Sequence, residues 1–138
     1  KNNSIDNALG MDTKGLEHFR EILRTTQLDS PTAGNVKKSE NELLIVAFSR
    51  LALGQTGDGH FSPIGGYLPS KDMVLVMDVA RFKYPSYFVS VPELWRAMTY
   101  VDVETLKPRG YVLVSDRPIE NRTEHGDSEL DVAYAESA

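Results

Sequence analysis

The chain has 138 residues, of which 41% are hydrophobic and 25% are charged, and these values are ordinary for a globular protein. A chain of this length suits one domain, and its net charge of −5 argues against a nucleic-acid partner, which needs a basic face. No apolar run approaches the roughly 20 residues that cross a bilayer. The composition therefore predicts a cytoplasmic protein with no membrane partner.

The sequence contains no cysteine. This excludes disulfides, thiolate metal sites and a thiol nucleophile among these residues. The three histidines, His18, His60 and His125, lie far apart, and none has a second histidine three to five residues away, as zinc ligands often do. We therefore assign no metal ligand to the chain.

In chain order, the pattern of apolar residues predicts helix, strand, strand, strand, helix, strand. The first helix covers residues 15–26, is capped by Asp12 or Thr13, and leads into an exposed loop at residues 27–42. Three strands are expected at residues 43–49, 61–68 and 73–79. Gly65 and Gly66 predict a bulge in the second strand.

The second half of the chain continues this alternation. A capping box at Ser90 and Glu93 opens a helix whose Leu94, Met98 and Val101 share a face and which closes near residue 102. The last strand is expected at residues 111–115, and residues 116–138 read as an acidic, disordered tail. Short links between strands indicate an antiparallel α+β fold.

The stretch of greatest chemical interest is the glycine-rich loop at residues 54–59, which delivers His60 to the start of a strand. The short turn at residues 69–72 brings the end of the next strand, with Asp78, to the same end of the hairpin. A carboxylate among valines and methionines needs a partner. His60 as a general base and Asp78 as the group that orients it would meet that need.

Other nucleophiles and ligands fit the pattern less well. A lone histidine often has no catalytic role. Ser49 and Ser62 lack the Gly-x-Ser-x-Gly elbow of serine hydrolases, and the glycine loop lacks the Lys-Ser/Thr and following helix of a phosphate cradle. These residues therefore predict a general base, His60, and its orienting carboxylate, Asp78, without a nucleophile in the same chain.

The motifs GQTGDGHFSPIGGY, MDVARFKYP, LWRAM and TLKPRGYVLVS, in this order, resemble the catalytic domain of the phytochelatin synthases. These are papain-like, clan CA transferases, also called glutathione gamma-glutamylcysteinyltransferases. The resemblance covers about residues 16–115. It implies that residues 1–115 correspond to the second half of that catalytic domain, an antiparallel sheet lobe with flanking helices.

The resemblance implies a reaction and its residues. The family transfers the γ-Glu-Cys unit of glutathione to another glutathione or to phytochelatin and releases glycine, in heavy-metal detoxification, through a Cys-His-Asp triad. By motif, His60 and Asp78 are the base and its orienter. Asp102 and Arg109 would bind the γ-glutamyl head of the donor, and these charges suit its ammonium and carboxylate. Arg81, Lys83 and Tyr84 would serve the acceptor glutathione.

The partners implied are glutathione, phytochelatin and the family's cysteine-bearing lobe, which comes from upstream sequence or another chain; a homodimer is also compatible. The elements that would face that lobe are expected to leave an exposed apolar patch. A heavy-metal ion such as cadmium or zinc would act as a thiolate complex of the substrate, and no cofactor is expected on the chain. Without a cysteine, we expect the chain alone to be inactive. Two alternatives are a glutathione hydrolase of the same family and a non-catalytic glutathione-binding pseudoenzyme.

Overall fold

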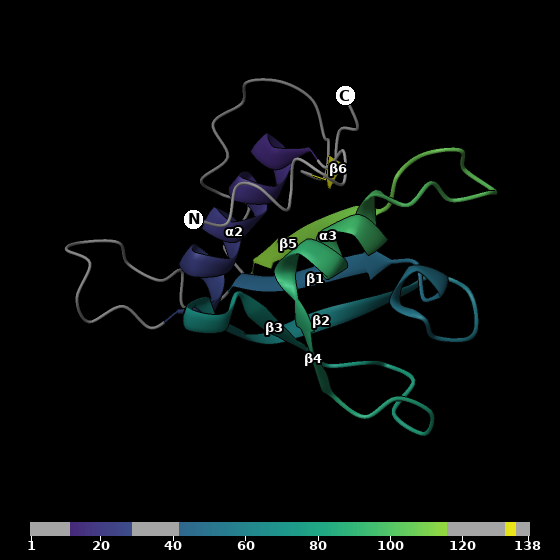
Figure 1. Cartoon of the computed structure of the whole chain (residues 1–138), viewed down its shortest axis with the longest axis horizontal. Helices are drawn as coiled ribbons and strands as arrows, with labels where there is room; N and C mark the ends of the chain where they lie inside the picture. The colour runs from purple at the N-terminus through teal and green to yellow at the C-terminus, as the bar shows by residue number, and fades with distance from the viewer. Residues whose placement is uncertain (1–11, 29–41, 116–131, 135–138) are drawn as a thin grey trace.

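The computed structural model describes residues 12–28, 42–115 and 132–134. In these ranges two α-helices pack on one face of a single antiparallel sheet (Figure 1). The sheet has six strands in the order β4-β3-β2-β1-β5-β6. The elements are α2 (Thr13–Gln27), β1 (Glu42–Phe48), η1 (Leu51–Leu53), β2 (His60–Leu68), η2 (Pro69–Lys71), β3 (Met73–Val76), β4 (Tyr87–Ser90), α3 (Val91–Thr99), β5 (Gly110–Ser115) and β6 (Val132–Tyr134). The predicted α+β class is confirmed.

Helix α2 forms where the sequence predicts it. The Asp12 carboxylate caps its start by accepting a hydrogen bond of 3.0 Å from the Gly15 amide. Leu16, Phe19 and Leu23 share one face and are fully buried. The helix therefore docks by an apolar stripe on the sheet.

Strand β1 is the central element of the sheet. Alternate side chains Leu44, Val46 and Phe48 are fully buried against the helices. Its last residues pair with the start of β2, through Phe48 and His60, and its Val46 pairs with the start of β5. The beginnings of β2 and β5 therefore lie on either side of the end of β1.

The β2–β3 hairpin contains the predicted bulge, because its register shifts between Ile64 and Gly66. Strand β3 ends at Val76, three residues before the end expected from the sequence. Beyond it, the Met77 amide still donates to the Pro63 carbonyl at 2.9 Å. Asp78 then turns the chain by accepting a hydrogen bond of 2.9 Å from the Ala80 amide, so it lies just past the strand.

Strand β4 was not predicted, and it pairs with β3 along its whole length. Helix α3 follows it directly. The Ser90 hydroxyl accepts from the Glu93 amide at 3.3 Å and donates to the Glu93 carboxylate at 2.6 Å, so Ser90 caps the helix as predicted. The helix ends at Thr99, so the expected extension to residue 102 is wrong. Val101 is instead half exposed, in an isolated bridge to Pro108.

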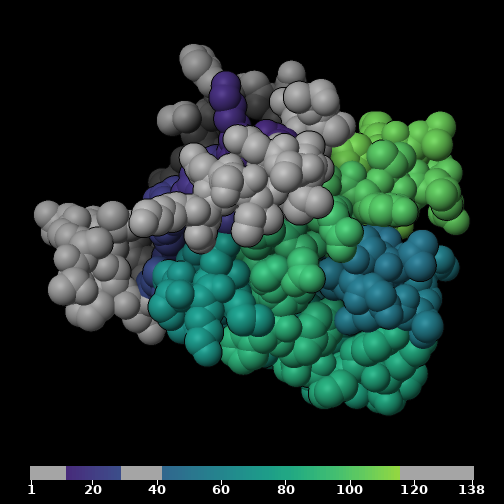
Figure 2. All heavy atoms as spheres, in the orientation of Figure 1, coloured from purple at the N-terminus to yellow at the C-terminus, as the bar shows by residue number. Residues whose placement is uncertain are grey.

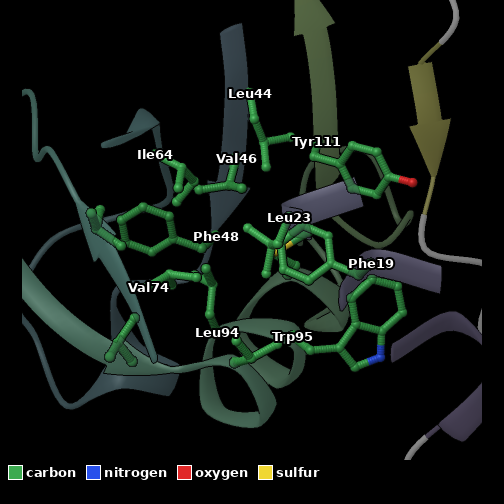
Figure 3. Packing of buried hydrophobic residues seen from close by; sticks show 14 of the residues in the cluster. Phe19, Leu23, Leu44, Val46, Phe48, Ile64, Val74, Leu94, Trp95 and Tyr111 are labelled. Atoms are coloured by element: carbon green, nitrogen blue, oxygen red, sulfur yellow. The ribbon is translucent and has the colours of Figure 1, made fainter. Parts of the chain in front are cut away.

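One hydrophobic core lies between the sheet and the two helices (Figure 3). Phe19 is its centre, with ring centroids 5.6 Å from Trp95 of α3 and 5.4 Å from Tyr111 of β5. Tilted aromatic packing of this kind adds about 0.5–1.5 kcal/mol per pair to the burial of apolar surface. The core thus ties both helices to the strands that carry the site residues.

The opposite face of the sheet carries exposed apolar side chains. Phe61 of β2 is 62% exposed, and Phe88 of β4 and Val114 of β5 are 57% and 46% exposed. Ala47 pairs with Phe61, and Leu75 pairs with Phe88, so these residues share the face that α2 and α3 leave uncovered. In the part of the chain that the structure describes, no element covers this face.

Strand β6 lies in the stretch that the sequence assigned to an acidic tail, and it pairs with β5. The rest of that tail, residues 116–131 and 135–138, lies outside the described residues. Most of the predicted loop at residues 27–42 does too, since residues 29–41 are not described. Among the described helices, none is long and apolar enough to cross a lipid bilayer.

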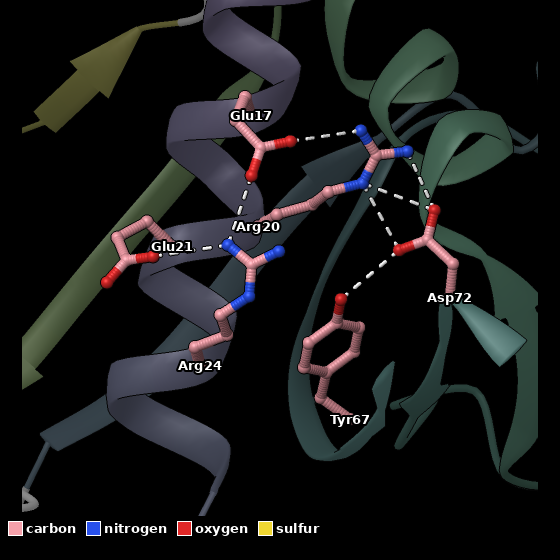
Figure 4. Close-up of polar contacts among 6 residues, drawn as sticks. All are labelled: Glu17, Arg20, Glu21, Arg24, Tyr67 and Asp72. Carbon is pink, nitrogen blue, oxygen red and sulfur yellow. Dashed lines mark hydrogen bonds and ion pairs between the residues drawn. The ribbon is translucent and has the colours of Figure 1, made fainter. Parts of the chain in front are cut away.

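A partly buried ion pair joins α2 to the β2–β3 turn (Figure 4). The Arg20 guanidinium donates to both oxygens of Asp72, with the shortest contact 2.7 Å, and the Tyr67 hydroxyl donates to the same carboxylate at 3.2 Å. Arg24, one turn along the helix, makes only exposed contacts with Glu17 and Glu21. The two arginines therefore differ in what they hold together.

We predict that Arg20→Ala lowers the free energy of unfolding by about 1.5–3 kcal/mol, because charge-assisted hydrogen bonds to a half-buried carboxylate are lost. Arg24→Ala is the matched control on the same helix and should cost at most about 1 kcal/mol, as exposed ion pairs do. Urea unfolding followed by circular dichroism measures both. Equal losses in the two variants would contradict the assigned role of Arg20.

Candidate functional site

The candidate site residues gather at the end of the sheet where β1 ends and β2 and β5 begin. Three connections meet there: the glycine loop before β2, the segment at residues 77–86 after β3, and the segment at residues 100–109 before β5. The core holds this end of the sheet in place, while the loops remain at the surface. Such loops on a rigid scaffold commonly carry binding and catalytic groups.

His60 is the first residue of β2, and its side chain is exposed. The preceding loop turns sharply, with Gly54 and Gly57 at φ values of 68° and 102°, a region that side chains disfavour. Within the described residues, no hydrogen bond is made by the His60 imidazole. The structure therefore presents this imidazole at the surface.

Asp78 is buried, at 2% exposure, but its partner is Arg50 and not His60 as the sequence suggested. Arg50 donates from Nη2 to Oδ1 at 2.7 Å and from Nη1 to Oδ2 at 2.9 Å. The reason for the correction is that Asp78 lies beyond the end of β3, where Arg50 reaches it from the end of β1. His60 makes no hydrogen bond to this carboxylate in the described structure.

Burial and hydrogen bonding act on the pKa of Asp78 in opposite directions. Burial alone would raise the pKa of Asp78, but the Arg50 N–H donors, the Ala80 amide and the Arg50 charge outweigh it and hold the pKa below its ordinary value. His60 contributes in the same direction and is the smallest of these causes. A lowered carboxyl pKa stabilises the fold above about pH 4, and this contribution is lost as the pH falls through the folded value.

Arg50 also holds the loops together. Its Nη1 donates to the Gln55 side chain at 2.8 Å. Its guanidinium carbon lies 4.8 Å from the centre of the Tyr84 ring and 5.6 Å from that of Phe48, which is cation–π geometry. This one buried side chain thus contacts β1, the glycine loop and the segment after β3.

Two of the three residues predicted to serve an acceptor are engaged with the glycine loop. The Tyr84 hydroxyl accepts a hydrogen bond of 2.8 Å from the Thr56 amide, and Lys83 Nζ donates to the Thr56 carbonyl at 3.3 Å. The bonds to Thr56 lower the pKa of Tyr84. Arg81 is exposed on the same segment. In Figure 2 the glycine loop, in blue, lies directly against this segment, in green.

Asp102 and Arg109 are brought together. Arg109 Nη2 donates to Asp102 Oδ2 at 2.6 Å, and Asp102 Oδ1 accepts from the amides of Glu104 and Thr105 at 3.0 Å each. These amide donors, followed by the Arg109 charge, lower the pKa of Asp102. A negative and a positive group are therefore held side by side in front of β5.

A pocket of about 400 Å³ joins this pair to the predicted base, because His60, Asp102 and Arg109 all line it. Gly59 lines it as well, and a side chain on Gly59 would collide with the Arg109 guanidinium. Glycine at this position is therefore what lets Arg109 lie across the loop backbone. Asp78 and the acceptor candidates do not line this pocket.

Sequence reasoning missed Arg50 and the tight fit of Gly59 against Arg109. A signal for Arg50 was present: a carboxylate predicted to be buried needs a cation, and Arg50 directly follows a buried strand. Nothing in the sequence gave the distance between positions 50 and 78. Among the described residues, no group of three or more histidine, cysteine or acidic side chains is arranged to hold a metal ion.

Comparison with known proteins agrees with the resemblance seen in the motifs. The profile of the phytochelatin synthase family matches residues 4–111. Glutathione gamma-glutamylcysteinyltransferase 1 of Lotus japonicus is 56% identical over 100 residues, which are 72% of this chain and 18% of that protein.

Two further relatives have the same description. The glutathione gamma-glutamylcysteinyltransferase of Schizosaccharomyces pombe is 49% identical over 75 residues, or 54% of this chain and 18% of the relative. Glutathione gamma-glutamylcysteinyltransferase 1 of Arabidopsis thaliana is 52% identical over 77 residues, or 56% of this chain and 16% of the relative. The match thus covers less than a fifth of each relative. The family profile spans most of this chain, which therefore belongs to the phytochelatin synthase family.

Proposed function

We propose that the chain supplies the base and the donor-binding groups for γ-glutamylcysteinyl transfer from glutathione. The observation that carries this proposal is the pocket in which His60 adjoins the Asp102–Arg109 pair. A pocket with a few convergent polar groups beside a titratable residue is a favourable place for a substrate and its chemistry. Membership of the family supports glutathione as that substrate.

The chemistry assigned to His60 is proton exchange with a thiol and an amine. A cysteine thiol from outside these 138 residues, which contain none, gives its proton to His60 and attacks the carbonyl of the Cys–Gly bond of glutathione. The C–N bond breaks, His60 returns the proton to the glycine amine, and a thioester remains. The amine of the acceptor then attacks the thioester, gives its extra proton to His60 and releases the thiolate.

The donor's γ-glutamyl head fits the pair at the other end of the pocket. This head carries an ammonium and a carboxylate on one carbon. Asp102 offers a carboxylate to the ammonium, and Arg109 offers a planar guanidinium to the carboxylate. Because the protein's two charges already lie 2.6 Å apart, they match a ligand whose own charges are adjacent and opposite.

The acceptor, glutathione or a growing phytochelatin, would lie on the side of the exposed Arg81. Lys83 and Tyr84 contribute there by holding the glycine loop. A heavy-metal ion such as cadmium or zinc would enter bound to the substrate thiolate, without a ligand from this chain. The partner that completes the triad is the cysteine-bearing lobe of the family, and the cytoplasm, where glutathione is abundant, is the proposed location.

The absence of cysteine also supports a second candidate, a non-catalytic glutathione-binding module. A glutathione hydrolase is a third, in which water takes the place of the acceptor amine. Adding glutathione and cadmium to the chain completed with a cysteine-bearing lobe separates them. Oligomeric thiol peptides form only with a transferase, free γ-Glu-Cys and glycine form with a hydrolase, and neither forms with a binding module.

We predict that the chain binds S-methylglutathione and that Arg109→Ala weakens this binding about tenfold or more, because a charge-assisted contact to the ligand carboxylate is lost. N-acetylation of the ligand, which removes its ammonium, should have a similar effect. Isothermal titration calorimetry measures the affinities. Arg96→Ala, an exposed arginine of α3 outside this pocket, is the matched control and should bind like the wild type. Equal binding by Arg109→Ala and wild type would contradict the assignment, as would no binding by the wild type.

We predict that His60→Ala, with a cysteine-bearing lobe of a relative supplied, lowers the rate of thioester formation by about 10²–10⁴-fold, the usual contribution of a general base. Asp78→Asn should lower it less, because the imidazole keeps its place. Mass spectrometry of the acylated cysteine and release of glycine follow the reaction. Circular dichroism checks that each variant is folded. Undiminished acylation in His60→Ala would refute the role of that residue.

A further inference from the structure

Arg50 is almost fully buried near the site, at 1% exposure. It directly follows β1, and its carbonyl organises the turn into the glycine loop by accepting hydrogen bonds from Leu53 and Gln55 at 3.1 Å and 2.9 Å. Its side chain makes a separate contact, because its guanidinium forms an ion pair with Asp78. A buried guanidinium is costly unless its N–H groups and its charge are satisfied.

Three hydrogen bonds fix the Asp78 carboxylate. Oδ1 accepts two hydrogen bonds, from Arg50 at 2.7 Å and from the Ala80 amide at 2.9 Å. Oδ2 accepts one, from Arg50 at 2.9 Å. The hydroxyl of the half-buried Tyr87 also interacts with this carboxylate. The Asp78 carboxylate is thus held at three points by Arg50 and the Ala80 amide.

We propose that Arg50 is a positioning residue that acts on His60 through Asp78. It fixes this carboxylate next to β2, where the preceding Met77 amide bonds to the Pro63 carbonyl, and it offsets the negative charge that His60 experiences. This inference rests on the proposed role of His60 as a base. Arg50 touches neither substrate nor reacting atoms, and it acts through Asp78.

Offsetting the charge matters because a base must be free of its proton before it can act. A buried carboxylate without a cation would either take up a proton itself or hold the nearby imidazole as an imidazolium. In the first case Asp78 could not stabilise the imidazolium that forms during catalysis. In the second, His60 would be protonated near neutral pH and unable to accept a proton from a thiol. A paired Asp78 avoids both.

The other charged groups near His60 are paired or exposed, and they include the exposed Asp58, two residues before it in the glycine loop. Asp102 and Arg109, across the pocket, are paired with each other. Glu104 is an exposed carboxylate on the pocket rim. Tyr87, whose pKa is raised mainly by burial, stays neutral beside Asp78. Removal of Arg50 therefore leaves Asp78 as the unbalanced buried charge on this side of the imidazole.

The test is an NMR titration of the His60 imidazole and the Asp78 carboxyl in the 138-residue chain, with His60→Gln used to assign the signals. Arg50→Gln should raise the His60 midpoint by about 0.5 pH unit or more, or add a second step as Asp78 titrates in the same range. Arg96→Gln is the matched control and should leave the His60 curve unchanged. A purely structural ion pair would change stability without moving this curve.

A His60 curve in folded Arg50→Gln that superimposes on the wild-type curve, in midpoint and in number of steps, would overturn the inference. Arg50→Lys covers the case in which Arg50→Gln does not fold, because lysine keeps the charge but loses one of the two parallel contacts. The titration midpoints of His60 and Asp78 should then rise by less than expected for Arg50→Gln. Unchanged midpoints in Arg50→Lys would overturn the inference equally. The result is independent of glutathione binding, so failure of the proposed function and failure of this inference appear in different experiments.

Discussion

The ion pair between Arg50 and Asp78 is the contact on which the arrangement of the site depends. It joins the end of β1 to the chain just beyond β3, and through Gln55 and Tyr84 it also fixes the glycine loop and the segment that follows. Buried pairs are rarely a net source of stability, because desolvation offsets most of their attraction. Such a pair instead favours one conformation. Because neither buried charge has another ion-pair partner among the described residues, the loops are held in the arrangement that keeps Arg50 and Asp78 in contact.

The fold was largely predictable because its signals are local. The buried run of β1, the bulge at Gly65 and Gly66 and the capping box at Ser90 are each encoded within a few neighbouring residues. The failures have physical causes. Strand β4 has four residues and runs directly into the cap of α3, so it has no room for a recognisable alternation. Strand β3 stops early because Asp78 leaves the ladder to meet Arg50.

The site was predictable in its residues more than in its contacts. The motifs pointed to His60, Asp102 and Arg109, and the structure lines one pocket with all three. The sequence also implied a partner for Asp78, but an ion pair between positions 28 residues apart depends on how β1, β2 and β3 lie side by side. The periodicity of apolar residues predicts which side chains are buried, but it does not predict which buried side chains contact one another.

The two arginine–carboxylate pairs on either side of His60 differ in how deeply they are buried. The Arg50–Asp78 pair has side chains at most 1% exposed, so no ligand can compete for it, and it acts as part of the frame. The side chains of the Arg109–Asp102 pair are 16% and 26% exposed, so this pair remains open to the pocket that it lines. His60 lies between a fixed pair and an open one. Under the proposed function, the donor would reach His60 from the side of the open pair, because that pair and His60 line the same pocket.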